Sequence, residues 1–358
     1  MRTPSLAGPL MAALATATIP AKAATDGTPA VTAESGQGRA EAAGSGLLGL
    51  PGPAATLTTL EGERIDLSAY YGKKPVYLKF WATWCVPCRE QMPGFEADYE
   101  TLGDRMAIIA VNTGFNDKPA TVRDFRQKMG LRMPVAVDDG SLAAALNLRV
   151  TPQHVVIGRD GRILYVGHLA DDKLHQALQA ALAEGGSAAG IASAPGHPQE
   201  ATYKPGDILP GLTTSITTGQ AFPLGGPSRD GKPRAVLFFS PWCESYLATS
   251  RPARAAACRQ AREVASSLAD QGQAHWLGVA SGLWASAKDL ADYQANPKTP
   301  VPGALPLTLD ADGHLFRAFG VREVPSLAII DAKGRITRIL GPEEITLATA
   351  QRTVAQAR

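Results

Sequence analysis

The sequence predicts an α/β protein of two tandem domains, each with a mixed central sheet flanked by helices. Three observations lead to this prediction. Two low-complexity stretches divide the chain, the two resulting segments repeat each other, and each segment follows the order strand, helix, strand, helix, hairpin, helix. Strands joined through helices, followed by an antiparallel hairpin, give a mixed sheet with helices on both faces. Of the 358 residues 45% are hydrophobic and 19% charged, so each segment can bury a core.

The N-terminus has the pattern of a secretory leader. Arg2 precedes a small, apolar stretch over residues 5–19, and Ala21-Lys22-Ala23 fits a small-x-small cleavage site. We therefore predict a signal peptide over residues 1–23 and a periplasmic or secreted location; an Ala-rich leader without a targeting role is the alternative. No stretch of about 18 apolar residues follows, so we expect no membrane span in the mature chain.

Composition marks the remaining boundaries. Residues 24–46 and 184–203 are rich in small and polar residues and are expected to be flexible linkers. They leave one domain over residues 47–183 and a second over residues 204–358. The formal net charge is +2 and no basic run occurs, so nothing in the composition points to nucleic acid.

The two domains repeat one pattern. The stretch KPVYLKFWATWC, which ends at Cys85, matches KPRAVLFFSPWC, which ends at Cys243, at an offset of 158 positions. Farther along, Pro152 aligns with Pro325 within two similar stretches, at an offset of 173 positions. The second domain therefore carries an insertion near its middle, and a duplication explains the pair better than two unrelated domains.

Each predicted element follows from local sequence. Apolar runs predict buried strands, Ala- and Glu-rich runs predict helices, and a two-residue turn with glycine predicts each hairpin. In the first domain the two strands, the second helix and the hairpin are expected at 76–81, 106–112, 121–129 and 155–165. In the second domain they are expected at 235–239, 275–280, 287–294 and 327–339.

The first domain carries Trp84-Cys85-Val86-Pro87-Cys88 where its first strand is expected to lead into a helix. A cysteine at a helix N-terminus is favoured as a thiolate by the free backbone N–H groups and the helix dipole. A second cysteine one turn along can attack a mixed disulfide formed by the first. The pattern predicts thiol–disulfide exchange; half of a zinc site and a structural disulfide are the alternatives. No cofactor or metal is expected.

The stretch FWATWCVPCREQMP, residues 80–93, resembles the active-site signature of the TlpA-like periplasmic thioredoxin family, and similarity extends over residues 48–182. This resemblance implies a thioredoxin fold, with Cys85 as the nucleophile and Cys88 as the resolving thiol. Pro152 matches the family's cis-proline loop, which docks extended client chains. The second domain resembles the family more weakly, as a degenerate copy.

Lys79 departs from the cytoplasmic thioredoxins, which carry a buried Asp six residues before the nucleophile. Lys79 alternates with Tyr77 and Trp81, so the three should share a face of the strand. A buried lysine there favours thiolates and stabilises the reduced pair. The alternative is a side chain that extends to solvent.

The second domain keeps Trp242-Cys243, but Tyr246 replaces the second cysteine and Leu237 replaces the lysine. Its remaining cysteine is Cys258. One straight helix would hold Cys243 and Cys258 about 22 Å apart, too far for a bond.

Pro252 argues against that straight helix, and a disulfide forms if residues 244–253 are a loop. The alternatives are a redox-active Cys243, a peroxiredoxin-like peroxidase assisted by Ser240, a copper site, and an inert scaffold.

Together these features predict an extracytoplasmic protein-disulfide oxidoreductase. It would reduce or isomerise disulfides of exported proteins, including apoproteins awaiting haem or copper. The expected partners are protein substrates with disulfides and a thiol electron donor. The alternatives are a client-binding or metal-handling adaptor, and a peroxidase in the second domain.

Overall fold

The computed structural model describes residues 1, 33–183, 201–297 and 305–358. The predicted signal peptide and most of the second predicted linker lie outside these residues.

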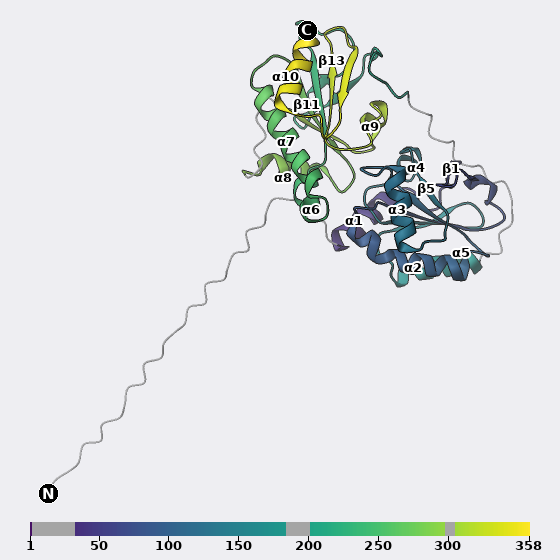
Figure 1. Ribbon diagram of the computed structural model, residues 1–358. Coiled ribbons are helices and arrows are strands. Elements are labelled where there is room, and N and C mark those ends of the chain that lie inside the picture. The colour runs from purple at the N-terminus through teal and green to yellow at the C-terminus, as the bar shows by residue number, and fades with distance from the viewer. Residues whose placement is uncertain (2–32, 184–200, 298–304) are drawn as a thin grey trace.

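Two five-stranded mixed sheets form the centres of two thioredoxin-like domains (Figure 1). The strand order is β5-β4-β3-β6-β7 in the first domain and β12-β11-β10-β13-β14 in the second. In each sheet the central strand pairs parallel with one neighbour and antiparallel with the first strand of a hairpin. Helices flank both sheets, so the predicted fold class is confirmed.

The strands and helices agree with the predicted ones to within two residues at each end. The first domain consists of α1 (Ala33–Gly44), β1 (Thr56–Thr58), β2 (Arg64–Asp66), β3 (Val76–Trp81), α2 (Val86–Leu102), β4 (Ala107–Asn112), α3 (Pro119–Met129), β5 (Val135–Val137), α4 (Ser141–Ala145), β6 (Gln153–Ile157), β7 (Ile163–Gly167) and α5 (Asp172–Ala183). The second consists of β8 (Thr213–Ser215), β9 (Ala221–Pro223), β10 (Arg234–Phe239), α6 (Cys243–Ser250), α7 (Pro252–Ala269), β11 (His275–Ser281), α8 (Ala287–Ala295), β12 (Leu307–Asp310), α9 (His314–Ala318), β13 (Ser326–Ile330), β14 (Ile336–Leu340) and α10 (Leu347–Gln356).

Helix α1 corrects one prediction, because it lies inside the expected flexible linker over residues 24–46. The helix packs on strand β7 at the edge of the first sheet. Gly36 fits closely there, since a Cβ at its position would lie 2.5 Å from His168 Nε2. A Cβ at Gly44 would likewise collide with Val166. The small residues that resemble a tether therefore allow a helix to approach the sheet.

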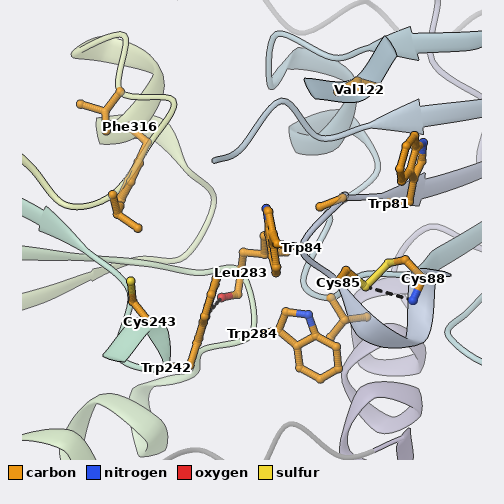
Figure 2. Packing of buried hydrophobic residues seen from close by; sticks show 14 of the residues in the cluster. Trp81, Trp84, Cys85, Cys88, Val122, Trp242, Cys243, Leu283, Trp284 and Phe316 are labelled. Carbon is orange, nitrogen blue, oxygen red and sulfur yellow. Dashed lines mark hydrogen bonds between the residues drawn. A yellow bond between two sulfur atoms is a disulfide. The ribbon is translucent and has the colours of Figure 1, made fainter. Parts of the chain in front are cut away.

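Both faces of the first sheet are buried. Tyr77 and Trp81 of β3 pack in one cluster with residues of α2, α3 and α5, while Leu78 and Phe80 pack in another with residues of α4. The first of these clusters continues into the second domain through Trp84 and Trp242 (Figure 2). The two domains therefore share one hydrophobic core where their Trp-Cys turns meet.

Candidate active site

Cys85 is the N-cap of helix α2, just past the end of strand β3. Its Sγ accepts a hydrogen bond from the backbone N–H of Cys88 at 3.2 Å. Pro87 occupies the first turn, where no intrahelical N–H bond is lost. The sulfur of Cys85 thus lies at the positive end of the helix dipole, which stabilises a thiolate.

Cys85 and Cys88 form a disulfide with their Cα atoms 5.2 Å apart. The bond before Pro152 is cis, and the carbonyl oxygen of Thr151 lies 3.3 Å from Cys85 Sγ. Both cysteines are buried, and Cys85 is only 1% exposed. The structure therefore brings together Cys85, Cys88 and Pro152, which are 67 positions apart at most, in one small site.

Trp84, the residue before the disulfide, is held from two sides. Its Nε1–H donates to the carbonyl oxygen of Phe115 at 2.7 Å. Its ring stacks on Trp242 of the second domain with centroids 5.1 Å apart, as Figure 2 shows. The predicted site residue Trp84 is thus also a contact between the domains.

A buried carboxylate anchors the turn before Cys85. Asp117 accepts hydrogen bonds from the backbone N–H and the hydroxyl of Thr83, at 2.7 and 2.6 Å, and from Asn112 Nδ2 at 2.9 Å. Its side chain is 0% exposed, so these donors replace the lost hydration. This anchor was not predicted from the sequence. The signal was present, because Asn112 ends a strand parallel to β3 and polar residues at that edge meet.

Lys79 is fully buried, and its Nζ has no hydrogen-bond partner. The solvent-exposed alternative is therefore wrong. Nζ lies 5.3 Å from the ring centroid of Phe95. Phe95 follows Cys88 by seven residues, about two helical turns, so the ammonium group points along α2 away from the sulfurs. Burial lowers the pKa of Lys79 to about 7, while the Asp98 carboxylate acts in the opposite direction.

A series of hydrogen-bonded, buried polar groups leads to the cis-proline, and it was not predicted from the sequence either. The hydroxyl of Tyr77 lies 2.8 Å from His154 Nδ1, and His154 Nε2 lies 2.8 Å from Gln91 Oε1. Gln91 Nε2 donates to the carbonyl oxygen of His168 at 3.2 Å, and His168 Nδ1 lies 2.7 Å from the carbonyl oxygen of Pro152.

Because a carbonyl oxygen only accepts, these distances place protons on His154 Nε2 and His168 Nδ1. Burial lowers the pKa of both imidazoles, so both are neutral. This series of hydrogen bonds fixes the position of the Pro152 carbonyl group relative to helix α2.

The second domain forms a different disulfide at the same turn. Cys243 is bonded to Cys258, with Cα atoms 6.2 Å apart. Residues 244–253 are not the loop on which the prediction depended. Helix α6 ends at Ser250, and α7 begins at Pro252, so the chain reverses between two helices and brings the sulfurs together.

Tyr246, which replaces the second cysteine, acts across the domain boundary. Its hydroxyl oxygen accepts the backbone N–H of Val86 at 3.1 Å. Val86 is the first residue of α2, directly after Cys85. The residue that removes dithiol chemistry from the second domain therefore contacts the dithiol helix of the first.

Within the described ranges, no three His, Cys, Asp or Glu side chains lie close enough together to hold a metal ion. No described helix has the length and hydropathy of a membrane-spanning segment.

Residues 48–166 match the AhpC/TSA family. The thioredoxin-like protein YneN of Bacillus subtilis is 35% identical over 133 residues, which cover 36% of this chain and 78% of YneN. The chain belongs to the AhpC/TSA family of thioredoxin-like proteins. The predicted TlpA-like resemblance therefore holds at the level of this wider family.

Relatives of this AhpC/TSA protein include the thiol–disulfide oxidoreductase ResA of Bacillus anthracis, 33% identical over 33% of this chain and 67% of ResA. Among solved structures, StoA of Bacillus subtilis is 25% identical over 36% of this chain and 99% of StoA, with a TM-score of 0.32. With its Cys-x-x-Cys pair, this AhpC/TSA protein is an enzyme of the thiol–disulfide oxidoreductase class. The family match ends before the second domain.

Proposed function

We propose that the chain reduces or isomerises disulfides of exported proteins outside the cytoplasm, with Cys85 as the nucleophile and Cys88 as the resolving thiol. The observation that carries this proposal is the placement of Cys85 Sγ. It accepts the Cys88 N–H at the start of α2 and lies 3.3 Å from the Thr151 carbonyl oxygen. That position favours a thiolate and adjoins the backbone on which a client chain would pair.

The exchange balances without a cofactor. The Cys85 thiolate attacks one sulfur of a client disulfide, forms a mixed disulfide and releases the other client sulfur as a thiolate. The Cys88 thiolate then attacks Cys85 Sγ, which restores the Cys85–Cys88 disulfide found in the structure and releases the second client thiol. Two electrons pass to the client, and a thiol donor returns them to the pair.

Three further residues have proposed roles in this reaction. Trp84 and Pro152 flank Cys85 and would line the groove that binds the client chain. Lys79 would bias the pair toward thiolates through its buried charge, which is partly present near neutral pH because its pKa is about 7. Its direction along α2 makes this a long-range effect.

The location and clients rest on the sequence. The leader pattern over residues 1–23 supports export. The two disulfides support an oxidising compartment. The resemblance to TlpA-like thioredoxins supports apoproteins awaiting haem or copper as clients.

The test is insulin reduction by the full chain with dithiothreitol as donor. We expect turnover by the unaltered protein, and rates at the uncatalysed background for both Cys85→Ser and Cys88→Ser. A Cys85→Ser variant that turns over normally would overturn the assignment.

An adaptor that holds clients without exchange is the second candidate, and the burial of Cys85 favours it. In that case the unaltered protein would bind reduced and oxidised clients equally and would not accelerate insulin reduction. A peroxidase in the second domain has less support, because Cys243 is buried and bonded to Cys258.

A further inference from the structure

Two loops cross the boundary between the domains in a reciprocal manner. The backbone N–H of Trp284 donates to the carbonyl oxygen of Arg149 at 2.8 Å, and that of Asn116 donates to the carbonyl oxygen of Arg322 at 2.8 Å. Each arginine lies three residues before the cis-proline of its own domain. Asn116 and Trp284 both have positive φ, 55° and 58°. Each domain thus extends the loop after its second sheet strand into the other's proline loop.

The tryptophans of the two Trp-Cys turns also make equivalent hydrogen bonds in the two domains. Trp84 Nε1–H donates to the carbonyl oxygen of Phe115, and Trp242 Nε1–H donates to that of Leu283, at 2.7 and 2.8 Å. Each tryptophan therefore supports the crossing loop of its own domain. The two rings stack on each other between the loops (Figure 2).

The arginine side chains complete the reciprocal contact. The Arg149 guanidinium donates to the carbonyl oxygen of Ala311 in the second domain. The Arg322 guanidinium donates to the carbonyl oxygen of Thr113 in the first, at 3.0 Å. Two matched hydrogen bonds in each direction, together with the shared tryptophan stack, describe a specific interface rather than a chance approach of two domains.

This interface covers the redox site. The indole of Trp284 lies beside the proline loop, with Nε1 3.4 Å from Thr151 Oγ1 and its ring edge-on to His168, centroids 5.4 Å apart. Figure 2 shows Trp284 next to the Cys85–Cys88 disulfide. Cys85 is 1% exposed in this arrangement. A protein disulfide has no path to its sulfur in this arrangement.

We propose that the second domain occupies the client groove of the first as a built-in competitor, so that a protein client reaches Cys85 only when the two domains part. This inference rests on the proposed function, since it concerns the same groove. The contacts of the second domain also indicate which features a client segment needs to bind in this groove. A client segment would donate a backbone N–H to the Arg149 carbonyl oxygen and place a bulky apolar or aromatic side chain where Trp284 lies.

The polar contacts of Arg251 and a cavity at the boundary would allow the two domains to separate. Arg251, at the break between α6 and α7, donates to the Asn116 carbonyl oxygen at 2.8 Å, to Asp117 Oδ1 at 3.1 Å and to the Thr83 hydroxyl. When the domains part, water can replace the three hydrogen bonds that Arg251 donates. A cavity of about 110 Å³ along the boundary, lined by residues of both domains such as Leu148 and Phe316, leaves the packing incomplete.

The test measures access to the Cys85–Cys88 disulfide in the oxidised full chain. A small phosphine and a thiol carried on a polyethylene glycol chain are each supplied as reductant, and peptide mass spectrometry follows the two disulfides separately. The unaltered protein should react much more slowly with the bulky thiol. Arg251→Ala removes the three hydrogen bonds that Arg251 donates across the boundary and should accelerate the bulky reagent about tenfold.

Arg259→Ala is the matched control, since Arg259 lies on α7 of the same domain with its side chain 59% exposed. It should leave both rates unchanged. Tyr246→Phe removes one hydroxyl contact with Val86 and should give a smaller acceleration if Arg251→Ala does not fold. Equal rates for both reagents in the unaltered protein, or folded variants that react no faster, would overturn the competitor role. Insulin turnover would still test the thiol chemistry, so the two proposals fail separately.

Discussion

Helices α2 and α6 begin with the same Trp-Cys turn at the same edge of the same kind of sheet, yet their cysteines have different partners. Cys85 is bonded within one helical turn, and Cys243 is bonded to Cys258 on the next helix. Both sulfurs of the first bond belong to the start of one helix. The second fixes α6 on α7. One turn therefore serves as a redox centre or as a staple, depending on where the second sulfur lies.

The largest expected difference between the turns is in turnover. Cys85→Ser should lower insulin reduction by at least about 10³-fold, because the attacking thiolate is lost. The double variant Cys243→Ser, Cys258→Ser should stay within about twofold of the unaltered protein, because this bridge takes no part in the exchange. Comparable losses of turnover in the two variants would show that both Trp-Cys turns take part in the exchange.

The next difference concerns Lys79 and its counterpart Leu237. Lys79→Leu makes the first domain resemble the second at this position and removes a buried, unpartnered amine. Burial lowers the Lys79 pKa to about 7 in the folded protein, whereas the unfolded chain titrates near 10.4. Between these values the unfolded state binds more protons, so stability rises with pH, and the cost of Lys79 is largest below pH 7.

Lys79→Leu should therefore raise the free energy of unfolding, and the gain at pH 6 should exceed the gain at pH 9 by about 2–3 kcal/mol. Urea unfolding at the two pH values measures it, with Leu237→Met as a control whose effect should not depend on pH. A gain for Lys79→Leu that does not vary with pH would show that the amine stays charged in the fold.

The staple should matter for stability. The double variant Cys243→Ser, Cys258→Ser opens a loop of 15 residues and should lower the free energy of unfolding by about 3 kcal/mol on the chain-entropy model. Thermal and denaturant unfolding followed at a second-domain tryptophan such as Trp276 would detect it. Unchanged stability combined with lost turnover on a protein client would make the second domain a redox relay instead.

The smallest effect is expected at Thr83. Thr83→Ser keeps the hydroxyl bonded to Asp117, whereas Thr83→Val removes it and leaves a buried carboxylate with fewer donors. Thr83→Val should cost about 1–2 kcal/mol of stability, and Thr83→Ser less. Denaturant unfolding of the two variants separates the hydroxyl from the methyl group, and a loss for Thr83→Val no larger than that for Thr83→Ser would contradict the role of the hydroxyl.

The fold and the redox pair were accessible from sequence because both are local or periodic signals. The apolar runs defined β3 and β10, and the Cys-x-x-Cys spacing defined the start of α2. The polar chain from Tyr77 to Pro152 was not accessible, because its members come from β3, α2, β6 and the residue just after β7 and meet only in the folded domain. Helix α1 was missed because the glycines that let it pack closely also lower its helical propensity.

The contact between the domains could not be predicted either, since it depends on how two similar surfaces fit. Leu283 and Trp284 carry no motif, and Tyr246 stood out only as a missing cysteine. The pattern showed that the second domain had lost dithiol chemistry. The hydrogen bond from the Val86 backbone N–H to the Tyr246 hydroxyl shows that the side chain in place of the second cysteine contacts the other domain.

The central claim is that the first domain performs the exchange and the second does not. Trapping of mixed disulfides tests it most directly, with Cys88→Ser in the full chain incubated with an oxidised protein client and analysed by peptide mass spectrometry. We expect the client to be attached to Cys85 and Cys243 to stay bonded to Cys258. A client attached to Cys243 or Cys258, with Cys85 unmodified, would contradict it.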